Sequence, residues 1–156
     1  YAGYLAASLI ASQDAEGLRR LIGIWEEANG KTGWSLFLKG YQNVLEEDVD
    51  SALEAFSNSY EHAPVWETAY NLSVLFEKKR DHHSAIEYLR KAETELAKTD
   101  AGAVERKAFV RSAIARVHYD RGDFDAAHRE ASYAIDLDPG SEEAALIKSL
   151  LEKNGD

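Results

Sequence analysis

The chain has 156 residues, 45% of them hydrophobic, and 18 Lys and Arg against 28 Asp and Glu give a formal net charge of −10. This composition fits one compact domain and excludes a disordered chain; an acidic surface also repels phosphate backbones, so we expect no nucleic-acid partner. The absence of Cys excludes disulfides, thiolate metal sites and cysteine nucleophiles.

The first predicted helix, residues 1–13, contains no charged side chain. A helix that is apolar on all sides is normally buried, so we expect upstream residues, a second copy or a partner to cover it. The chain begins without Met, which is consistent with missing upstream residues. The large side chains of this candidate docking face are Tyr1, Tyr4, Leu5 and Leu9.

The following segments alternate between apolar helical periodicity and short turns rich in Asp, Gly and Pro, and no segment shows the alternation typical of a strand. After a second helix that ends near Gly30, further helices are predicted over 33–46, 66–79, 81–98 and 101–121. Residues 141–153 form a last amphipathic helix, with Ala145, Leu146, Leu150 and Leu151 along one face. Such a helix would cap an array of helices.

Small and apolar residues recur at fixed places along the chain. The three clearest copies are Ala52, Phe56, Ser59 and Pro64; Ala85, Leu89 and Ala92; and Ala127, Ala131, Ala134 and Pro139. A weaker copy contains Leu18, Ile22 and Trp25. The copies are 34, 33 and 42 residues apart, and a period of 34 residues is typical of a repeated pair of helices.

These features resemble the tetratricopeptide repeat. The first-helix pattern of that family is matched by Trp34, Phe37-Leu38 and Tyr41, and less well by Ala69, Leu72-Ser73 and Phe76. The resemblance implies an all-α fold, an α-α superhelix or solenoid of about four helical hairpins plus a C-terminal capping helix. It predicts a single domain over residues 1–156, with repeats over approximately 1–30, 31–64, 65–98 and 101–140 and the cap over 141–153.

The pattern departs from the family in two places. In the second copy the first and second helices are two residues out of phase, which predicts a longer turn around Leu45–Asp48. The spacing of 42 residues between the last two copies leaves eight extra residues, about two helical turns. We expect each of the helices 81–98 and 101–121 to gain about one turn.

The sequence offers no catalytic constellation, phosphate-binding loop or nucleophile elbow. The segment Asp81-His82-His83 is its one metal-like cluster, but adjacent histidines at a helix start point about 100° apart, and no third ligand follows on the same face. We interpret this segment as a solvated turn. The chain is therefore predicted not to be an enzyme, and no cofactor or metal is expected.

The resemblance implies that first helices line a concave groove and that their outward faces bind a partner. The candidate groove residues are Lys39, Gln42, Asn43, Tyr70, Asn71, Val74, Glu77, Phe109, Ser112, Arg116 and Tyr119. Tyr and Arg are frequent in recognition hot spots. Some family members grip a C-terminal carboxylate with Lys, Asn and Arg; Asn71 matches one such position, but the full clamp is absent here.

We therefore predict a non-enzymatic module that binds a protein or peptide partner in the groove. The alternative is a structural or assembly subunit that self-associates or docks through its apolar N-terminal helix. A third possibility, a subunit that holds an apolar small ligand, has no marked pocket in the sequence. No run of about 20 apolar residues suggests a membrane span. We expect a soluble protein of either cytoplasm or periplasm; the sequence identifies neither the compartment, the oligomeric state nor the partner.

Overall fold

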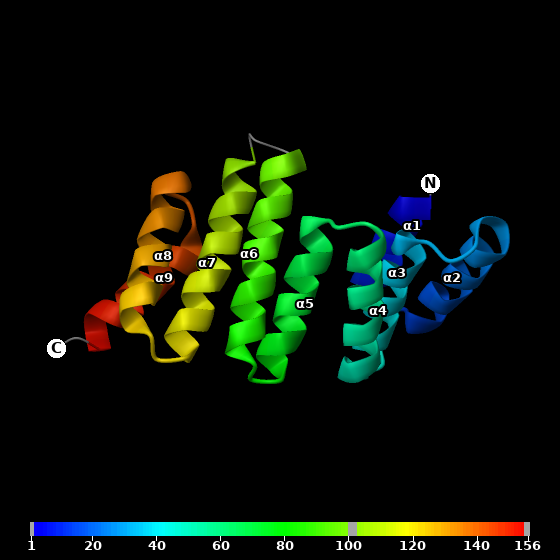
Figure 1. Ribbon diagram of the computed structural model, residues 1–156, viewed down its shortest axis with the longest axis horizontal. Coiled ribbons are helices and arrows are strands. Elements are labelled where there is room, and N and C mark those ends of the chain that lie inside the picture. Colours follow the sequence, from blue (N-terminus) through cyan, green and yellow to red (C-terminus); the bar gives the residue numbers. More distant parts are fainter. Residues whose placement is uncertain (1, 100–102, 155–156) are drawn as a thin grey trace. The chain divides into compact units, whose positions relative to one another are not determined.

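The computed structural model describes residues 2–99 and 103–154, and these residues form nine α-helices and no strand (Figure 1). The helices are α1 (Ala2–Ala11), α2 (Ala15–Asn29), α3 (Gly33–Leu45), α4 (Val49–His62), α5 (Trp66–Lys78), α6 (His82–Thr99), α7 (Val104–Asp120), α8 (Phe124–Leu137) and α9 (Glu142–Asn154). The predicted all-α class, with four successive helix pairs and a final single helix, is confirmed. The chain divides into two compact units, residues 1–75 and 76–156, with the boundary inside α5.

The two helices of each pair are joined by the same three-residue turn. Its middle residue has a positive φ in every copy: 57° at Gln13, 60° at Glu47, 62° at Arg80 and 81° at Gly122. The next residue is always Asp, whose backbone N–H donates to the carbonyl five residues earlier at 2.9 Å. The Asp carboxylate accepts a hydrogen bond from the backbone N–H three residues later and so caps the second helix.

These turns fix the register of the repeat. Each capping Asp lies four residues before Leu18, Ala52, Ala85 or Ala127, and a small residue lies twelve residues before each of these positions. The small residues, all buried, are Ala6, Gly40, Ser73 and Ala115. The predicted longer turn around Leu45–Asp48 is therefore wrong. The first-helix pattern that begins at Trp34 lies two residues out of register, and Gly40 occupies the small position.

Gly40 is small because α3 and α4 approach closely there. A Cβ atom built on Gly40 would lie 2.6–2.7 Å from three ring atoms of Phe56, whose side chain is fully buried. The edges of Phe37 and Tyr41 contact the same ring, with centroids 5.7 and 5.4 Å from it. Phe56 is therefore the centre of the α3–α4 pair.

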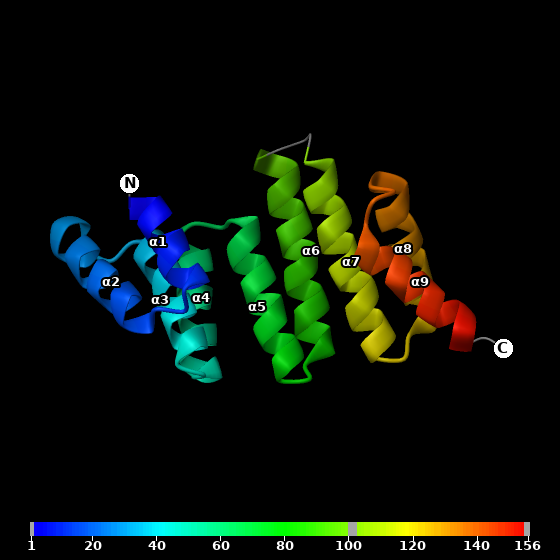
Figure 2. The same ribbon diagram turned by 180° about the vertical axis from the view of Figure 1, so that it is seen from behind.

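The unit of residues 1–75 has a core that joins α1, α2 and α3. Ala6, Leu18, Leu21, Ile22 and Leu38 form this core, and Leu9 and Ile10 pack against it. Figure 2 shows α1 lying in front of α3. Only Ala6 of α1 is buried, so α1 is held by few side chains.

The unit of residues 76–156 is built around an alanine seam. Ala115 of α7 packs with Ala127, Ala131 and Ala134 of α8, and Ala144 and Ile147 of α9 complete the cluster. Helix α9 contacts both α7 and α8, as predicted for a capping helix. Alanine on facing helices allows close approach because there is little side chain to separate the two backbones.

Helices α6 and α7 are the two longest, with 18 and 17 residues, whereas α3, α4, α5 and α8 have 13 or 14. The prediction that the extra residues lengthen both helices by about one turn is confirmed. The two helices run side by side and contact each other, so their length is matched (Figures 1 and 2).

Candidate interaction surface

The register places four positions of each first helix on one face, beside the small-residue seam. They lie 18, 15, 11 and 8 residues before Ala52, Ala85 and Ala127, and we call them the open face. The open face comprises Trp34, Phe37, Tyr41 and Val44 in α3; Glu67, Tyr70, Val74 and Glu77 in α5; and Phe109, Ser112, Arg116 and Tyr119 in α7. Seven of these eight residues in α5 and α7, all except Glu67, were predicted from the sequence to line the groove, but the four in α3 were not.

The sequence-based expectation for α3 is wrong in orientation. Lys39, Gln42 and Asn43 correspond in register to Leu72, Leu75 and Phe76 of α5, of which Leu72 and Leu75 are buried, rather than to its open face. The side chains of Gln42 and Asn43 are buried. Lys39 is exposed but lines a polar pocket of about 240 Å³ on the α3–α4 pair. The two-residue displacement of the pattern at Trp34 causes this error.

In the unit of residues 1–75, the open-face residue Tyr41 of α3 is joined to Asn71 of α5 by a hydrogen bond. The Asn71 side-chain N–H donates to the Tyr41 hydroxyl at 3.0 Å. Burial raises the pKa of Tyr41; the hydrogen bond with Asn71 opposes this shift and the nearby Glu67 carboxylate adds to it. Tyr41 therefore stays protonated and holds Asn71 in place. Asn71 is predicted to bind a partner, and the structure gives its amide this intramolecular role.

The same unit contains an apolar pocket of about 320 Å³. Trp34 and Phe37 of α3, the end of α4 and the start of α5 surround it. Its full lining is Gly33, Trp34, Phe37, Ser59, Ala63, Val65, Glu67 and Thr68. The indole of Trp34 is also backed by Trp25, with the ring centroids 4.4 Å apart. Two open-face aromatics of α3 thus form one wall of a pocket that has a single charged residue, Glu67.

In the unit of residues 76–156, Arg116 of the open face is held in place by two carboxylates. Its guanidinium pairs with Glu77 and donates to Glu143 of α9 at 2.8 Å. Burial raises the pKa of Glu77, although the charge of Arg116 opposes the shift. Both Arg116 and Glu77 are predicted groove residues, and the structure brings them together. Their charges are largely satisfied by each other and by Glu143.

Ser112 does not face outward as expected, because its exposed fraction is only 1%. Its hydroxyl donates to the Ala108 carbonyl and lies 2.9 Å from the Ser141 hydroxyl, just before α9. Of the remaining predicted groove residues, Phe109 is 42% exposed and Val74 is 41% exposed, whereas Tyr70 and Tyr119 are half-buried. Phe109, Tyr119, Tyr70 and Val74 are thus the apolar side chains that a partner can reach.

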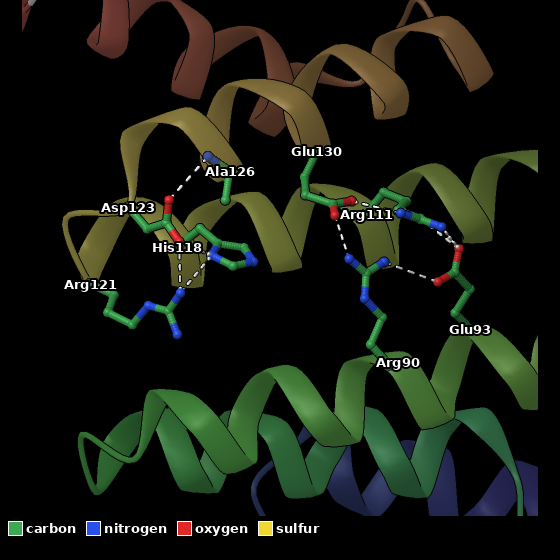
Figure 3. Close-up of polar contacts among 8 residues, drawn as sticks. All are labelled: Arg90, Glu93, Arg111, His118, Arg121, Asp123, Ala126 and Glu130. Atoms are coloured by element: carbon green, nitrogen blue, oxygen red, sulfur yellow. Dashed lines mark hydrogen bonds and ion pairs between the residues drawn. The ribbon is translucent and has the colours of Figure 1, made fainter.

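A second set of charges ties α6, α7 and α8 together away from the open face (Figure 3). Arg111 donates to Glu93 at 2.6 Å and to Glu130 at 2.7 Å, while Arg90 pairs with the same two carboxylates. Burial by itself would raise the pKa of Glu130, but the hydrogen bonds from Arg111 and Arg90 outweigh it and lower the pKa. The four side chains form a closed ring of alternating charge.

The predicted docking face of the N-terminal helix is only partly exposed. Tyr4 and Leu5 of α1 are 88% and 45% exposed, whereas Leu9 packs against the core; Tyr1 lies outside the described residues. Leu5 lies thirteen residues before Leu18, the position that the fully buried Leu72 and Ile114 occupy in later repeats. In α1, a packing position therefore faces solvent.

The repeat register agrees with the sequence comparisons. The pattern of the tetratricopeptide repeat matches residues 46–102 and 112–155, which together exceed half of the chain. The chain belongs to the tetratricopeptide-repeat family. Tetratricopeptide repeats are a fold of protein–protein interaction, so membership assigns the chain to this class of module. Among curated proteins, no sequence matches the chain significantly.

Solved tetratricopeptide structures have the same fold. A crystal structure of MamA is 18% identical and superposes with a TM-score of 0.75, covering 97% of this chain and 84% of that one. The tetratricopeptide domain of Arabidopsis OM64 is 13% identical, with a TM-score of 0.66 and coverage of 79% and 96%. A chain of the APC/C hetero-tetramer Cut9–Hcn1 is 13% identical, with a TM-score of 0.52 and coverage of 88% of this chain and 31% of that one. At these identities the likeness concerns the fold.

Residues 2–99 and 103–154 contain neither a metal-binding cluster nor a helix able to span a membrane. No three His, Asp or Glu side chains there are close enough to hold a metal ion. Asp81 of the metal-like cluster instead caps α6 through Ser84. None of the described helices has the length and hydrophobicity needed to cross a bilayer.

Proposed function

We propose that this chain is a non-enzymatic module that binds a segment of a partner protein along the open faces of its first helices. In tetratricopeptide proteins these helices line the concave groove. The observation that carries the proposal is the accumulation of Trp, Phe and Tyr at open-face positions, where Phe109 stays 42% exposed. Aromatic side chains supply large contact areas at low entropic cost and dominate binding hot spots.

The polar residues on and beside the open face serve a different purpose from the aromatic ones. Asn71 is bonded to Tyr41, and Arg116 is bonded to Glu77 and Glu143. Charges that are already paired contribute little extra affinity, because a partner must first replace the existing contacts. We therefore assign affinity to Tyr70, Phe109 and Tyr119 and assign to the polar pairs the task of holding the first helices in register.

A random-peptide display on the purified chain tests this assignment. Peptides selected on the wild type should bind the triple variant Tyr70→Ala, Phe109→Ala, Tyr119→Ala about tenfold more weakly or worse. A tenfold loss of affinity corresponds to about 1.4 kcal/mol of binding free energy. Because Tyr119 packs against Phe124, the variant's thermal midpoint is measured first, and Phe109→Ala alone is the fallback. Tyr4→Ala is the matched control on α1. If the folded variant binds the peptides as tightly as the wild type does, the open-face aromatic residues are not the binding site.

A second function is favoured by Leu5 of α1, which is exposed although the equivalent residues of later repeats, Leu72 and Ile114, are buried. The side chains of Tyr4 and Leu5 are exposed on a helix without charge, and exposed apolar patches of this kind mark interfaces. We propose self-association of the chain through α1 as the alternative. Sedimentation velocity should then show concentration-dependent association that Leu5→Lys abolishes. A wild-type monomer at every concentration would rule this alternative out.

A further inference from the structure

The apolar pocket beside Trp34 has the dimensions of a binding site for one large side chain. Its volume of about 320 Å³ is at the lower end of the range for ligand pockets. Trp34, Phe37 and Val65 supply apolar wall, and Val65 is itself 38% exposed at the surface. Such a pocket gains free energy by removing an aromatic or long aliphatic side chain from water.

The pocket is lined by oxygen atoms that can accept hydrogen bonds, and none of the basic side chains that the structure describes lines it. Glu67, an exposed residue, is its one charged lining residue. Thr68 also lines the pocket; its side chain is fully buried, and its Oγ1 has no hydrogen-bond partner among the described residues. A buried hydroxyl without a partner costs free energy. A donor N–H close to the apolar group of a ligand is the group that would satisfy the exposed Glu67 carboxylate.

The charge around the pocket selects the same chemistry. Residues 40–77 contain no Lys or Arg, whereas Glu46, Glu47, Asp48, Asp50, Glu54, Glu61, Glu67 and Glu77 all lie in this stretch. The unit of residues 1–75 has four basic and eleven acidic residues, a net charge of −7, whereas residues 76–156 sum to −3. A positively charged segment is therefore attracted to this unit and an acidic one is repelled.

We propose that the pocket anchors a basic segment of a partner protein by one large apolar side chain, with a neighbouring Lys or Arg against Glu67. This inference rests on the proposed function and specifies the partner's chemistry. The apolar side chain enters between Trp34 and Phe37, and the basic flank follows the acidic surface of α4 and α5. Charge steers the segment to the unit, and the pocket sets its register.

Three capped pentapeptides separate these contributions: acetyl-Lys-Lys-Phe-Lys-Lys-amide, the same peptide with Ala at its centre, and the same peptide with Glu in place of every Lys. Each is titrated into the ¹⁵N-labelled chain. The Lys–Phe peptide should shift the amides of Gly33, Phe37 and Thr68 and bind at least about tenfold more tightly than the other two. Equal binding of the Phe and Ala peptides, equal binding of the acidic peptide, or no binding at all would overturn the proposal.

Two variants locate the bound peptide. Ala63→Leu fills the pocket from an exposed position at the end of α4. It should lower the affinity for the Lys–Phe peptide about tenfold. Glu67→Gln should lower the affinity for the Lys–Phe peptide about threefold and make that affinity less dependent on salt. Glu54→Gln makes the same charge change outside the pocket and should lower the affinity by less than half as much. An unchanged affinity in Ala63→Leu would contradict the pocket. If display-selected peptides still require Tyr70 and Phe109, the proposed function survives that failure.

Discussion

Single residues set the distance between the helices of a pair. Gly40 leaves room for the Phe56 ring, and the same place is taken by Ala6, Ser73 and Ala115 in the other repeats. The requirement is steric, since Gly40 lies within a regular helix and its φ is not positive. The contact explains why a helix-weakening residue occurs in the middle of α3.

Gly40→Ala should therefore destabilise the protein. The new Cβ lies 2.6 Å from Phe56 ring atoms, and overpacking of this kind costs about 1–3 kcal/mol, partly offset by the better helix propensity of Ala. Gly23→Ala in α2 is the matched control, because nothing lies within 4 Å of its Cβ and only the propensity gain remains. Urea denaturation should give opposite signs for the two variants. A stabilised Gly40→Ala would show that α3 and α4 are not in close contact.

His118 makes the stability of the second unit depend on pH. Burial and the charge of Arg121 lower the pKa of His118, while Asp123 opposes the shift (Figure 3). The unfolded imidazole, with a pKa near 6.5, therefore binds a proton more readily than the folded one. Stability should fall as the pH drops below about 6.5.

Urea denaturation at pH 7.5 and 5.5 checks this sign. Wild type should lose more stability over this interval than His118→Gln, which cannot titrate. His128→Gln, at an exposed position of α8, is the control for loss of one imidazole. Identical pH dependence in wild type and His118→Gln would contradict the role assigned to His118.

At the scale of elements, a ring of four charges joins three helices. Arg90 and Glu93 lie on α6, Arg111 on α7 and Glu130 on α8, and Arg111 also lies over the Tyr133 ring at 4.5 Å. The carboxylate of Glu130 is 14% exposed and that of Glu93 is 23% exposed. Partial burial weakens screening by salt, so this ring contributes more than a pair on the surface.

Glu130→Gln should reveal the strength of this ring. The change removes two ion pairs and leaves Arg90 and Arg111 with Glu93 alone, and we expect a loss of about 1–3 kcal/mol, between the values for surface and buried pairs. Glu87→Gln breaks an i,i+4 pair with Lys91 on the surface of α6 and should cost about 0.5 kcal/mol or less. Chemical denaturation compares the two. Equal costs would mean that the ring adds nothing beyond separate surface pairs.

The elements also show which features the sequence predicts and which it does not. Helical periodicity and the small residues at Ala52, Ala85 and Ala127 predict the helix pairs, because burial imposes both patterns locally. The first-helix register of the second pair is misassigned because Trp34 and Leu38 imitate the family pattern by chance. Asp48 precedes Ala52 by the same spacing as Asp123 precedes Ala127. The small residue of the first helix, placed relative to this Asp as in the other repeats, is Gly40, so the Asp gives the correct register.

At the scale of the whole molecule, the fold class follows from the repeat, but the accessible surface does not. The sequence predicts Ser112 to be outside, and contact with Ser141 buries it. It also gives no sign of the pocket at Trp34, because that pocket is formed where the end of α4 and the start of α5 meet α3. Periodicity specifies which side of a helix is buried against its own partner helix, whereas these features depend on helices that follow later in the chain.

Recognition through the first helices is the central functional claim, and mapping a bound peptide on the ¹⁵N-labelled chain tests it most directly. A peptide selected by display is titrated, and the amide shifts are assigned along the sequence. We expect the largest shifts in α3, α5 and α7, at open-face positions such as Phe37, Tyr70 and Phe109. Shifts confined to the second helices α4 and α8, or to α1, would contradict this claim.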